Sequence, residues 1–273
     1  MAALRTARSR AGLSREDAAH SMHWSLSKLH RIETGEQGIS VNDLKALLSL
    51  YGMADEERLG ELTQLALGSR MHSWWSSYRD VISRPFGQYL SLEGSASRLR
   101  VFHPFLVPSL LHTREYGYEL LKVGAGEEHA PALLELRSKR QDRMFNQQEP
   151  PEMEFVFGEE ALKRPIGSAS IMERQCRRLL ELMAMPHVSV RIVPLEAGAY
   201  PGLIGSFILM SLQGAYEELL FLEGAGSDMV SQDERHVIDP FMQRFETLAS
   251  VALTEDDTRS LIRHGLETFM RLS

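Results

Sequence analysis

The side chains whose types and spacing could support a specific chemistry lie within the sequence GLSREDAAHSMHWSLSKLHRIETG at residues 12–35. In its second half, Leu29 and Ile32 recur at the three-residue spacing of one buried helix face. Around them lie side chains that can donate hydrogen bonds or carry positive charge: Ser25, Ser27, Lys28, His30 and Arg31. A short helix of this kind offers its polar face to phosphates and to the edges of bases.

Such a face needs a second helix that crosses the first closely and holds it in place. Ser14 offers a helix N-cap and Asp17 completes an approximate capping box, so a short helix is predicted over residues 15–22. Ala19 supplies a small side chain where the next helix can pack. His23 lies at the centre of the turn, where φ is expected to be positive, a region that histidine tolerates better than most residues. The next helix, capped at Ser25 or a neighbour, is predicted to run to about residue 34.

The remaining N-terminal residues predict three more helices. The first covers residues 3–11 and ends at Gly12, because glycine commonly ends helices. Ser40 is predicted to cap a helix that ends at Gly52, and a fifth helix is predicted over residues 55–67. The segment at residues 68–70, Gly-Ser-Arg, is typical of a linker. We therefore expect a compact all-α domain over residues 1–68 and a second domain over residues 69–273.

Residues 2–52 resemble the XRE-type helix-turn-helix family, whose relatives include the lambda-phage repressor and Cro. The match rests on Gly-Leu-Ser at residues 12–14 and on Arg-Ile-Glu-Thr-Gly at residues 31–35. The resemblance implies that Glu33 is structural and pairs with an arginine of the first helix, Arg5 or Arg8. The sequence departs from the family at His23, where glycine is common. It departs again at Arg15, where the family often has a glutamine that contacts phosphate.

The resemblance implies that the protein binds double-stranded DNA, and the geometry of such motifs suggests which residues would read bases. N-terminal residues of the recognition helix reach base edges, so Leu26, Ser27 and Lys28 are the candidates. Leu26 could contact a thymine methyl group, or it could belong to the buried face with Leu29 and Ile32. Lys28 could reach O6 or N7 of guanine.

Other polar residues of the motif are expected to position the domain on the phosphate backbone. Arg15, Ser25 and Arg31 are the candidates for phosphate contacts, which carry no sequence information themselves. His30 is either a DNA contact or a solvated surface residue. Because one motif reads only a few base pairs, we expect a homodimer that reads two half-sites.

The sequence from residue 69 onward predicts a mixture of strands and helices. Apolar or β-branched runs bounded by Pro and Gly predict strands at residues 154–157, 188–193, 206–212 and 218–223. Helices are predicted at about residues 129–146, 168–184, 234–252 and 255–271. The fold class expected for the whole chain is therefore multi-domain, with an all-α helix-turn-helix domain followed by an α+β domain.

This second part is similar to a set of actinobacterial, WhiJ-like transcriptional regulators. The matching features include Trp74-Trp75, Glu160-Ala161-Leu162 and the segment Pro-Ser-Leu-Leu-His-Thr at residues 108–113, where the family often has Pro-Gly-Leu-Leu-Gln-Thr. The resemblance implies a regulator described as antitoxin-like and commonly encoded beside a small partner protein. It assigns no role to single residues, so the domain could bind that partner, a metabolite or a second copy of itself.

Motifs of catalysis are scarce in this chain. The sequence contains no HExxH, CxxC, GxSxG or Walker-type loop, and its 10 histidines are scattered. The order Arg98 or Arg100, Ser206, Glu223 is similar to that of ADP-ribosyltransferases. The alternative places Arg98 and Glu223 in ion pairs at the surface or between domains. We expect no enzyme, no metal and no cofactor.

Composition gives weaker guidance. The formal net charge is −7, which is unusual for a DNA-binding protein, although residues 1–35 carry six basic and three acidic side chains, a net of +3. This acidity keeps open the alternative of a protein-interaction module that has the helix-turn-helix fold and binds no DNA. The single cysteine, Cys176, is expected to be a buried packing residue. With no apolar run long enough to span a membrane and no signal-peptide pattern, we expect a cytoplasmic protein.

Overall fold

A computed structural model describes residues 2–33, 41–52, 74–203, 205–212, 218–223, 228–232 and 234–272. The chain divides into two compact units, Met1–Ser77 and Tyr78–Ser273. The first is helical and the second mixes helices with one sheet, which confirms the predicted fold class. The N-cap predicted at Ser40, the helix predicted over residues 55–67 and the boundary predicted at residue 68 lie outside the described residues.

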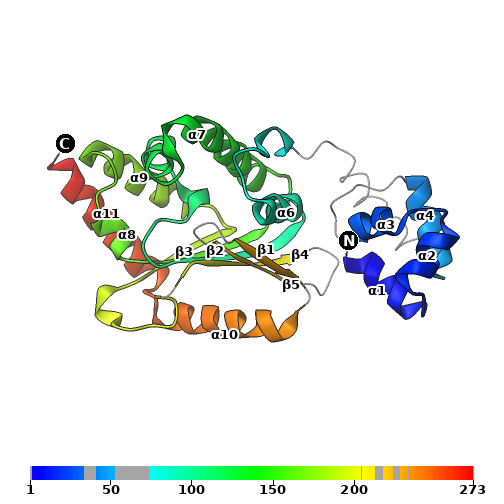
Figure 1. The fold of residues 1–273 in the computed structure, drawn as a ribbon. Helices are drawn as coiled ribbons and strands as arrows, with labels where there is room; N and C mark the ends of the chain where they lie inside the picture. Colours follow the sequence, from blue (N-terminus) through cyan, green and yellow to red (C-terminus); the bar gives the residue numbers. More distant parts are fainter. Residues whose placement is uncertain are drawn as a thin grey trace. The chain divides into compact units, whose positions relative to one another are not determined.

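The N-terminal unit contains α1 (Ala2–Arg10), α2 (Arg15–Ser21), α3 (Leu26–Glu33) and α4 (Val41–Leu50) (Figure 1). The predicted capping box is confirmed: Ser14 Oγ accepts from the backbone N–H of Asp17, and the Asp17 carboxylate accepts from that of Ser14. His23 has a φ of 52°, as predicted for the centre of the turn. Gly12 and Gly52 also have positive φ, where the predictions had α1 and α4 end.

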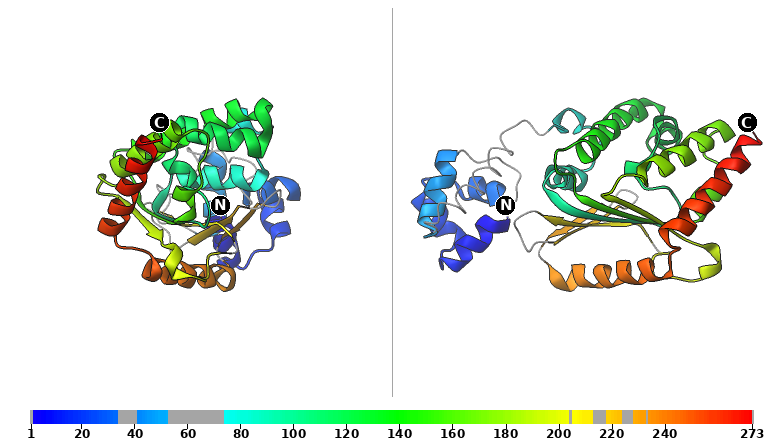
Figure 2. Two further views of the ribbon diagram at one scale, coloured as in Figure 1. Left: turned by 90° about the vertical axis from the view of Figure 1, so that its left-hand side faces the viewer. Right: turned by 180° about the vertical axis from the view of Figure 1, so that it is seen from behind.

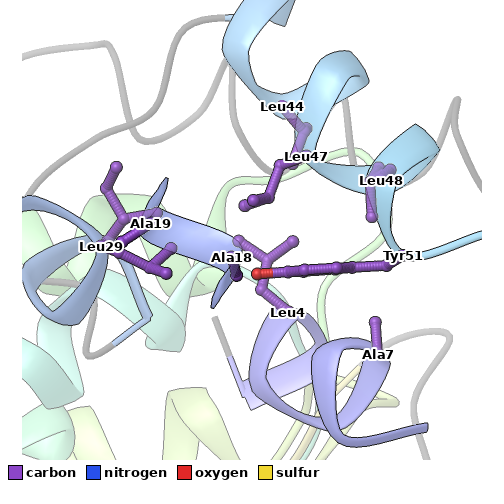
Figure 3. Packing of buried hydrophobic residues seen from close by; sticks show 10 residues of the cluster. Leu4, Ala7, Ala18, Ala19, Leu29, Leu44, Leu47, Leu48 and Tyr51 are labelled. Carbon is purple, nitrogen blue, oxygen red and sulfur yellow. The ribbon is translucent and has the colours of Figure 1, made fainter. Parts of the chain in front are cut away.

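The core of this unit forms where the four helices meet (Figure 3). Ala18 and Ala19 are buried on α2, so α3 can approach α2 closely and pack Leu29 against it. Tyr51 extends from the end of α4 into the same core. Its hydroxyl group is buried without a hydrogen-bond partner among the described residues. The small residue predicted at the helix crossing is therefore confirmed.

The C-terminal unit is built on a six-stranded sheet with the strand order β3-β2-β1-β4-β5-β6. The strands are β1 (Ala96–His103), β2 (Glu152–Gly158), β3 (Val188–Val193), β4 (Phe207–Leu212), β5 (Glu218–Leu222) and β6 (Met229–Gln232). β1, β2 and β3 are parallel, whereas β4, β5 and β6 join through antiparallel pairs. The four predicted strands are confirmed as β2 to β5. β1 and β6 were not predicted.

Helices cover both faces of the sheet (Figures 1 and 2). The α-helices are α6 (Arg84–Glu93), α7 (Arg114–Phe145), α8 (Glu160–Lys163), α9 (Ala169–Leu182), α10 (Arg235–Val251) and α11 (Glu255–Met270). Short 3₁₀ helices lie at Ser76–Tyr78, Ser109–Leu111 and Leu195–Ala197. α6, α7 and α9 lie on one face and α10 on the other. α11 packs against α9 and the edge strand β3.

Helix α7 corrects one prediction. It begins at Arg114, well before the expected start near residue 129. Gly126, with φ 84° and ψ 160°, interrupts it, and a second helical stretch follows, with Pro131 near its start, where proline is tolerated. The first stretch was missed because Gly117 and Gly124 weaken its helical pattern. Helix α6 was missed as well, since its aromatic residues hid the cap at Ser83.

Both faces of the sheet carry buried apolar side chains, as expected of a sheet covered by helices on both sides, and β1 also carries the ion-paired Arg98 and Arg100. Towards α10, a cluster built around Phe102, Phe207 and Phe245 fills the space between strands and helix. Cys176 is buried on α9, as predicted, and burial raises the pKa of its thiol to about 11. Among the described helices, none has a stretch both long and apolar enough to cross a bilayer.

Candidate functional site

The recognition helix α3 is held to the rest of the N-terminal unit by its last residue, Glu33. The Glu33 side chain is only 1% exposed. Arg8 Nε on α1 donates to Glu33 Oε1 at 2.6 Å, and Arg15 Nε on α2 donates to Glu33 Oε2 at 3.0 Å. The hydrogen bond to Glu33 raises the pKa of Arg8. The predicted pairing of Glu33 with an arginine of the first helix is confirmed for Arg8.

Arg15 joins this cluster, which the sequence did not indicate. Its Nε is committed to Glu33, and its side chain is 35% exposed. A phosphate contact by its remaining N–H groups stays a prediction. One carboxylate therefore ties together three helices, α1, α2 and α3, and fixes the crossing angle on which the outward face of α3 depends.

The N-terminal end of α3 presents its first residues to solvent. Ser25 caps the helix, because its Oγ accepts from the backbone N–H of Lys28 at 3.1 Å. Leu26 is 45% exposed, whereas Leu29 and Ile32 are fully buried. The interpretation that placed Leu26 in the buried face is therefore wrong. An exposed leucine at the start of a recognition helix is suited to an apolar contact with a thymine methyl group.

Lys28 is less accessible than a freely extended lysine. Its Nζ lies 3.9 Å from the centroid of the Trp24 ring and 3.7 Å from a carboxylate oxygen of Asp43. Both contacts hold the ammonium group against its own unit. To reach guanine, Lys28 would have to leave the face of an aromatic ring, at a cost of about 0.5–1 kcal/mol.

The rest of the outward face of α3 consists of Ser27, His30 and Arg31, all exposed. Arg31 Nε donates to the backbone oxygen of Ser27 at 3.2 Å, which directs the guanidinium along the helix surface towards its N-terminal end. The structure thus brings Leu26, Ser27, His30 and Arg31 onto one accessible surface. The DNA contacts of these residues, and those of Arg15, Ser25 and Lys28, stay predictions.

Removing the side chain of Leu26 should relax one base preference. We expect Leu26→Ala to leave folding unchanged, because the side chain is 45% exposed. It should cost about 1–3 kcal/mol on a preferred site with thymine at one position, and little once that thymine is replaced by cytosine. Titration of the two DNA sites with the wild-type protein and with the variant measures this difference in binding free energy. Equal weakening on both sites would contradict a methyl contact.

The C-terminal unit holds a buried ion pair between α6 and α7. Arg140 donates twice to the carboxylate of Glu93, from Nη2 at 2.6 Å and from Nε at 3.1 Å. The Tyr89 hydroxyl donates to the same carboxylate at 2.6 Å. Although burial opposes the charge, Glu93 and Tyr89 raise the pKa of Arg140 overall. The three side chains form a buried polar network between α6 and α7.

A second arginine one turn earlier on α7 has a neutral partner. Arg137 Nη1 donates to His112 Nδ1 at 2.8 Å, and His112 Nε2 donates to the backbone oxygen of Val107 at 2.6 Å. Burial and the positive charge of Arg137 lower the pKa of His112 well below its usual value. His112 is therefore neutral, with its proton on Nε2.

Comparison with known protein families agrees with this division of the chain. Residues 2–60 match a helix-turn-helix domain, and residues 86–264 match a family described as Domain of unknown function (DUF5753). The second match spans more than half of the 273 residues. The chain belongs to the DUF5753 family. No curated protein and no solved structure matches the chain.

The DUF5753 domain does not bring together the residues that were compared with ADP-ribosyltransferases. Arg98 pairs with Glu154 and Arg100 with Glu218, and Arg100 Nη2 also contacts Met242 Sδ of α10 at 3.8 Å. Glu223 instead shares a pocket with Arg137 of α7 on the opposite face of the sheet. The ion pair of Arg98 agrees with the non-catalytic alternative, and no group of metal-binding side chains was found among the described residues.

The stability of the DUF5753 domain should fall in mild acid because of His103. Its Nδ1 accepts the backbone N–H groups of Phe105 and Leu106, and burial lowers its pKa from 6.5 to about 4. The unfolded chain therefore binds a proton that the folded chain excludes between these pH values, so stability is lost as pH falls through this window. The shift corresponds to about 3 kcal/mol. Urea unfolding at pH 7.5 and 4.5 measures the loss.

A matched pair of variants isolates this contribution from that of the carboxylates. His103→Asn keeps an acceptor near the two N–H groups and cannot titrate, so its stability should depend less on pH. His264→Asn, at an exposed position of α11, should keep the wild-type dependence. The same pH dependence in both variants would rule out His103 as its source.

Proposed function

We propose that this protein is a sequence-specific, double-stranded DNA-binding transcriptional regulator of the XRE type, acting in the cytoplasm as a repressor or antitoxin-like factor. The observation that carries the proposal is the construction of α3. Its N-terminal half exposes Leu26, Ser27 and Arg31, while Glu33 is clamped by two arginines at its other end. A helix held rigidly at one end and exposed at the other can enter the major groove in a fixed orientation.

Electrostatics support DNA binding only locally. Arg8 and Arg15 form ion pairs with Glu33. Lys28 lies against Asp43. Much of the basic charge near α3 is therefore paired with carboxylates of the same unit. Arg5, Arg10 and Arg31 are exposed. Few phosphate contacts would follow, so the affinity should vary only moderately with salt. Base contacts would then supply a larger share of the binding free energy.

The DUF5753 domain, in this proposal, works by binding rather than by catalysis. Its similarity to WhiJ-like regulators supports a role in which it takes a small partner protein, a ligand or a second subunit. A homodimer would let two copies of α3 read two half-sites about one helical turn apart, which multiplies specificity. Sedimentation of the protein alone and with its DNA site would show two chains per site.

The test of DNA binding uses the segment just upstream of the protein's own gene. Arg31→Ala should weaken binding about 5- to 100-fold, equivalent to about 1–3 kcal/mol. If Arg31 contacts a phosphate, the loss of affinity should be similar on all DNA sequences. The slope of log affinity against log salt concentration should then become shallower by about one. Titrations at two salt concentrations measure both effects. Arg174→Ala, an exposed arginine of α9, is the matched control and should bind as wild type does.

Two outcomes would contradict the proposal. Absence of binding at low salt by a folded protein would favour the protein-interaction module, in which the helix-turn-helix binds another protein. If Arg31→Ala and Leu26→Ala each bound DNA as tightly as the wild-type protein, the DNA contact would lie elsewhere than on α3.

A further inference from the structure

The DUF5753 domain has a pocket, partly open to solvent, on the face of the sheet that α6 and α7 cover. Its volume is about 230 Å³. It is smaller than the roughly 300–1,000 Å³ of sites for drug-sized ligands. The pocket can therefore hold a small metabolite.

Most of the pocket wall is apolar. The side chains come from α6, from α7 and from the strands β4 and β5: Phe86, Leu121, Leu133, Leu136, Ile208 and Phe221. Phe86 and Phe221 lie with their ring centroids 5.7 Å apart and form one aromatic corner. A wall of this kind favours a ligand that has an aliphatic or aromatic body.

One of the two arginines in this wall makes no direct ion pair with a described carboxylate. Arg137 and Arg140 both line the pocket, and Arg140 is neutralised by Glu93. Arg137 donates only to His112 Nδ1 and, at 3.5 Å, to the backbone oxygen of Gly117, and it forms no ion pair within the described part of the chain. Burial and then the neighbouring Arg140 lower the pKa of Arg137 to about 10. A guanidinium in this position gains from an anion that enters the pocket.

The same pocket also contains negative charge. Glu223, at the end of β5, and Asp228, just before β6, belong to its lining. Asp228 accepts a hydrogen bond from the hydroxyl group of Ser83. Glu223 attracts Arg137 without forming an ion pair with it. A ligand that presents an anion alone would add a negative charge near Glu223, so a ligand that also has a cationic group suits the pocket better.

We propose that this pocket binds a small zwitterion with an apolar side chain, the chemistry of an aliphatic or aromatic α-amino acid. The ligand's carboxylate lies against Arg137, its ammonium group faces Glu223 and Asp228, and its side chain packs among Phe86, Leu136 and Phe221. The three features of the pocket are thereby matched at once: an arginine without a direct ion pair, two carboxylates and an apolar wall of limited volume.

Calorimetric titration of the full chain with L-leucine, L-methionine and L-phenylalanine tests the proposal. At least one of the three should bind. Two probes related to L-leucine separate its charged groups: 4-methylpentanoate lacks the amine and 3-methylbutylamine lacks the carboxylate. Both should bind at least 10-fold more weakly than the amino acid, because 4-methylpentanoate offers no cation to Glu223 and 3-methylbutylamine offers no anion to Arg137.

Two variants test the two ends of the pocket separately. Arg137→Gln should weaken binding of the amino acid by about 10- to 100-fold, the effect of losing a charge-assisted hydrogen bond. Glu223→Gln, at an exposed position, should weaken the amino acid but leave 4-methylpentanoate unchanged. Arg174→Gln, on the exposed surface of α9, is the control for the loss of an arginine and should bind as wild type does.

Three results would overturn the proposal. They are absence of binding by all three amino acids, unchanged affinity in both Arg137→Gln and Glu223→Gln, or binding of 4-methylpentanoate as tight as that of L-leucine. Glu223→Gln keeps the test decisive should Arg137→Gln fail to fold. No DNA is present in these titrations, so their outcome is independent of the DNA-binding proposal.

Discussion

Replacing Glu93 with leucine is expected to lower the free energy of unfolding of the DUF5753 domain by about 3–5 kcal/mol. The Arg140 side chain is 5% exposed, and Glu93 accepts two of its hydrogen bonds. Without the carboxylate, a guanidinium remains buried between α6 and α7, and its hydrogen-bond partners among the described residues are the Tyr89 and Ser109 hydroxyl groups. Urea unfolding followed by circular dichroism measures the loss.

Two further variants show that the cost comes from the unpaired charge. Glu181→Leu removes an exposed glutamate of α9 and should change stability by less than about 0.5 kcal/mol. The triple variant Glu93→Leu, Arg140→Met, Tyr89→Phe removes all three polar groups together and should recover most of the stability, since apolar groups of similar volume can replace a buried ion pair. A loss in Glu93→Leu no larger than in Glu181→Leu would contradict this account.

The helix-turn-helix could be predicted from sequence because its determinants are local. Ser14 and Asp17 cap the same helix three residues apart, and His23 adopts its positive φ within a four-residue turn. Leu29 and Ile32 are buried as their spacing predicted. Turn and cap chemistry acts within one helical turn, so a short stretch of sequence contains all of it.

The sheet of the DUF5753 domain was only partly predictable because its pairings are distant in sequence. β1 lies at the centre of the sheet, yet it carries Arg98 and Arg100, which argue against a buried strand. Their partners, Glu154 and Glu218, lie 56 and 118 residues further along the chain. Only the folded sheet shows that these charges are paired, so the strand looked too polar when read alone.

The same reason limits what the sequence indicated about sites. Lys28 has the type and place of a base-reading residue, and its ammonium group nevertheless lies against Trp24. Arg137 looks like any helical surface arginine, and it lines a pocket beside a neutral histidine 25 residues away. The spacing of residues along one helix predicts which face they share. It does not predict what the rest of the fold places against that face.

Replacing Glu33 with alanine is the second change with a large expected effect. It removes the carboxylate that holds Arg8 and Arg15, and it leaves the Arg8 side chain, which is 10% exposed, without a counter-ion. We expect a loss of about 3–5 kcal/mol from the N-terminal unit. Since whole domains are stable by only about 5–15 kcal/mol, this small unit should unfold at a much lower temperature while the DUF5753 domain keeps its own transition. Calorimetry resolves the two transitions.

The controls for Glu33 link stability to DNA binding. Glu16→Ala removes an exposed glutamate of α2 and should leave the first transition in place. Glu33→Gln keeps one acceptor for Arg8, so it should lose less stability than Glu33→Ala and retain more DNA binding at a temperature where both are partly folded. Because Glu33 is buried and cannot reach DNA, any loss of binding in Glu33→Gln should match its loss of folded protein. Loss of binding by a fully folded Glu33→Ala would instead show that the clamp sets the orientation of α3 without contributing to stability.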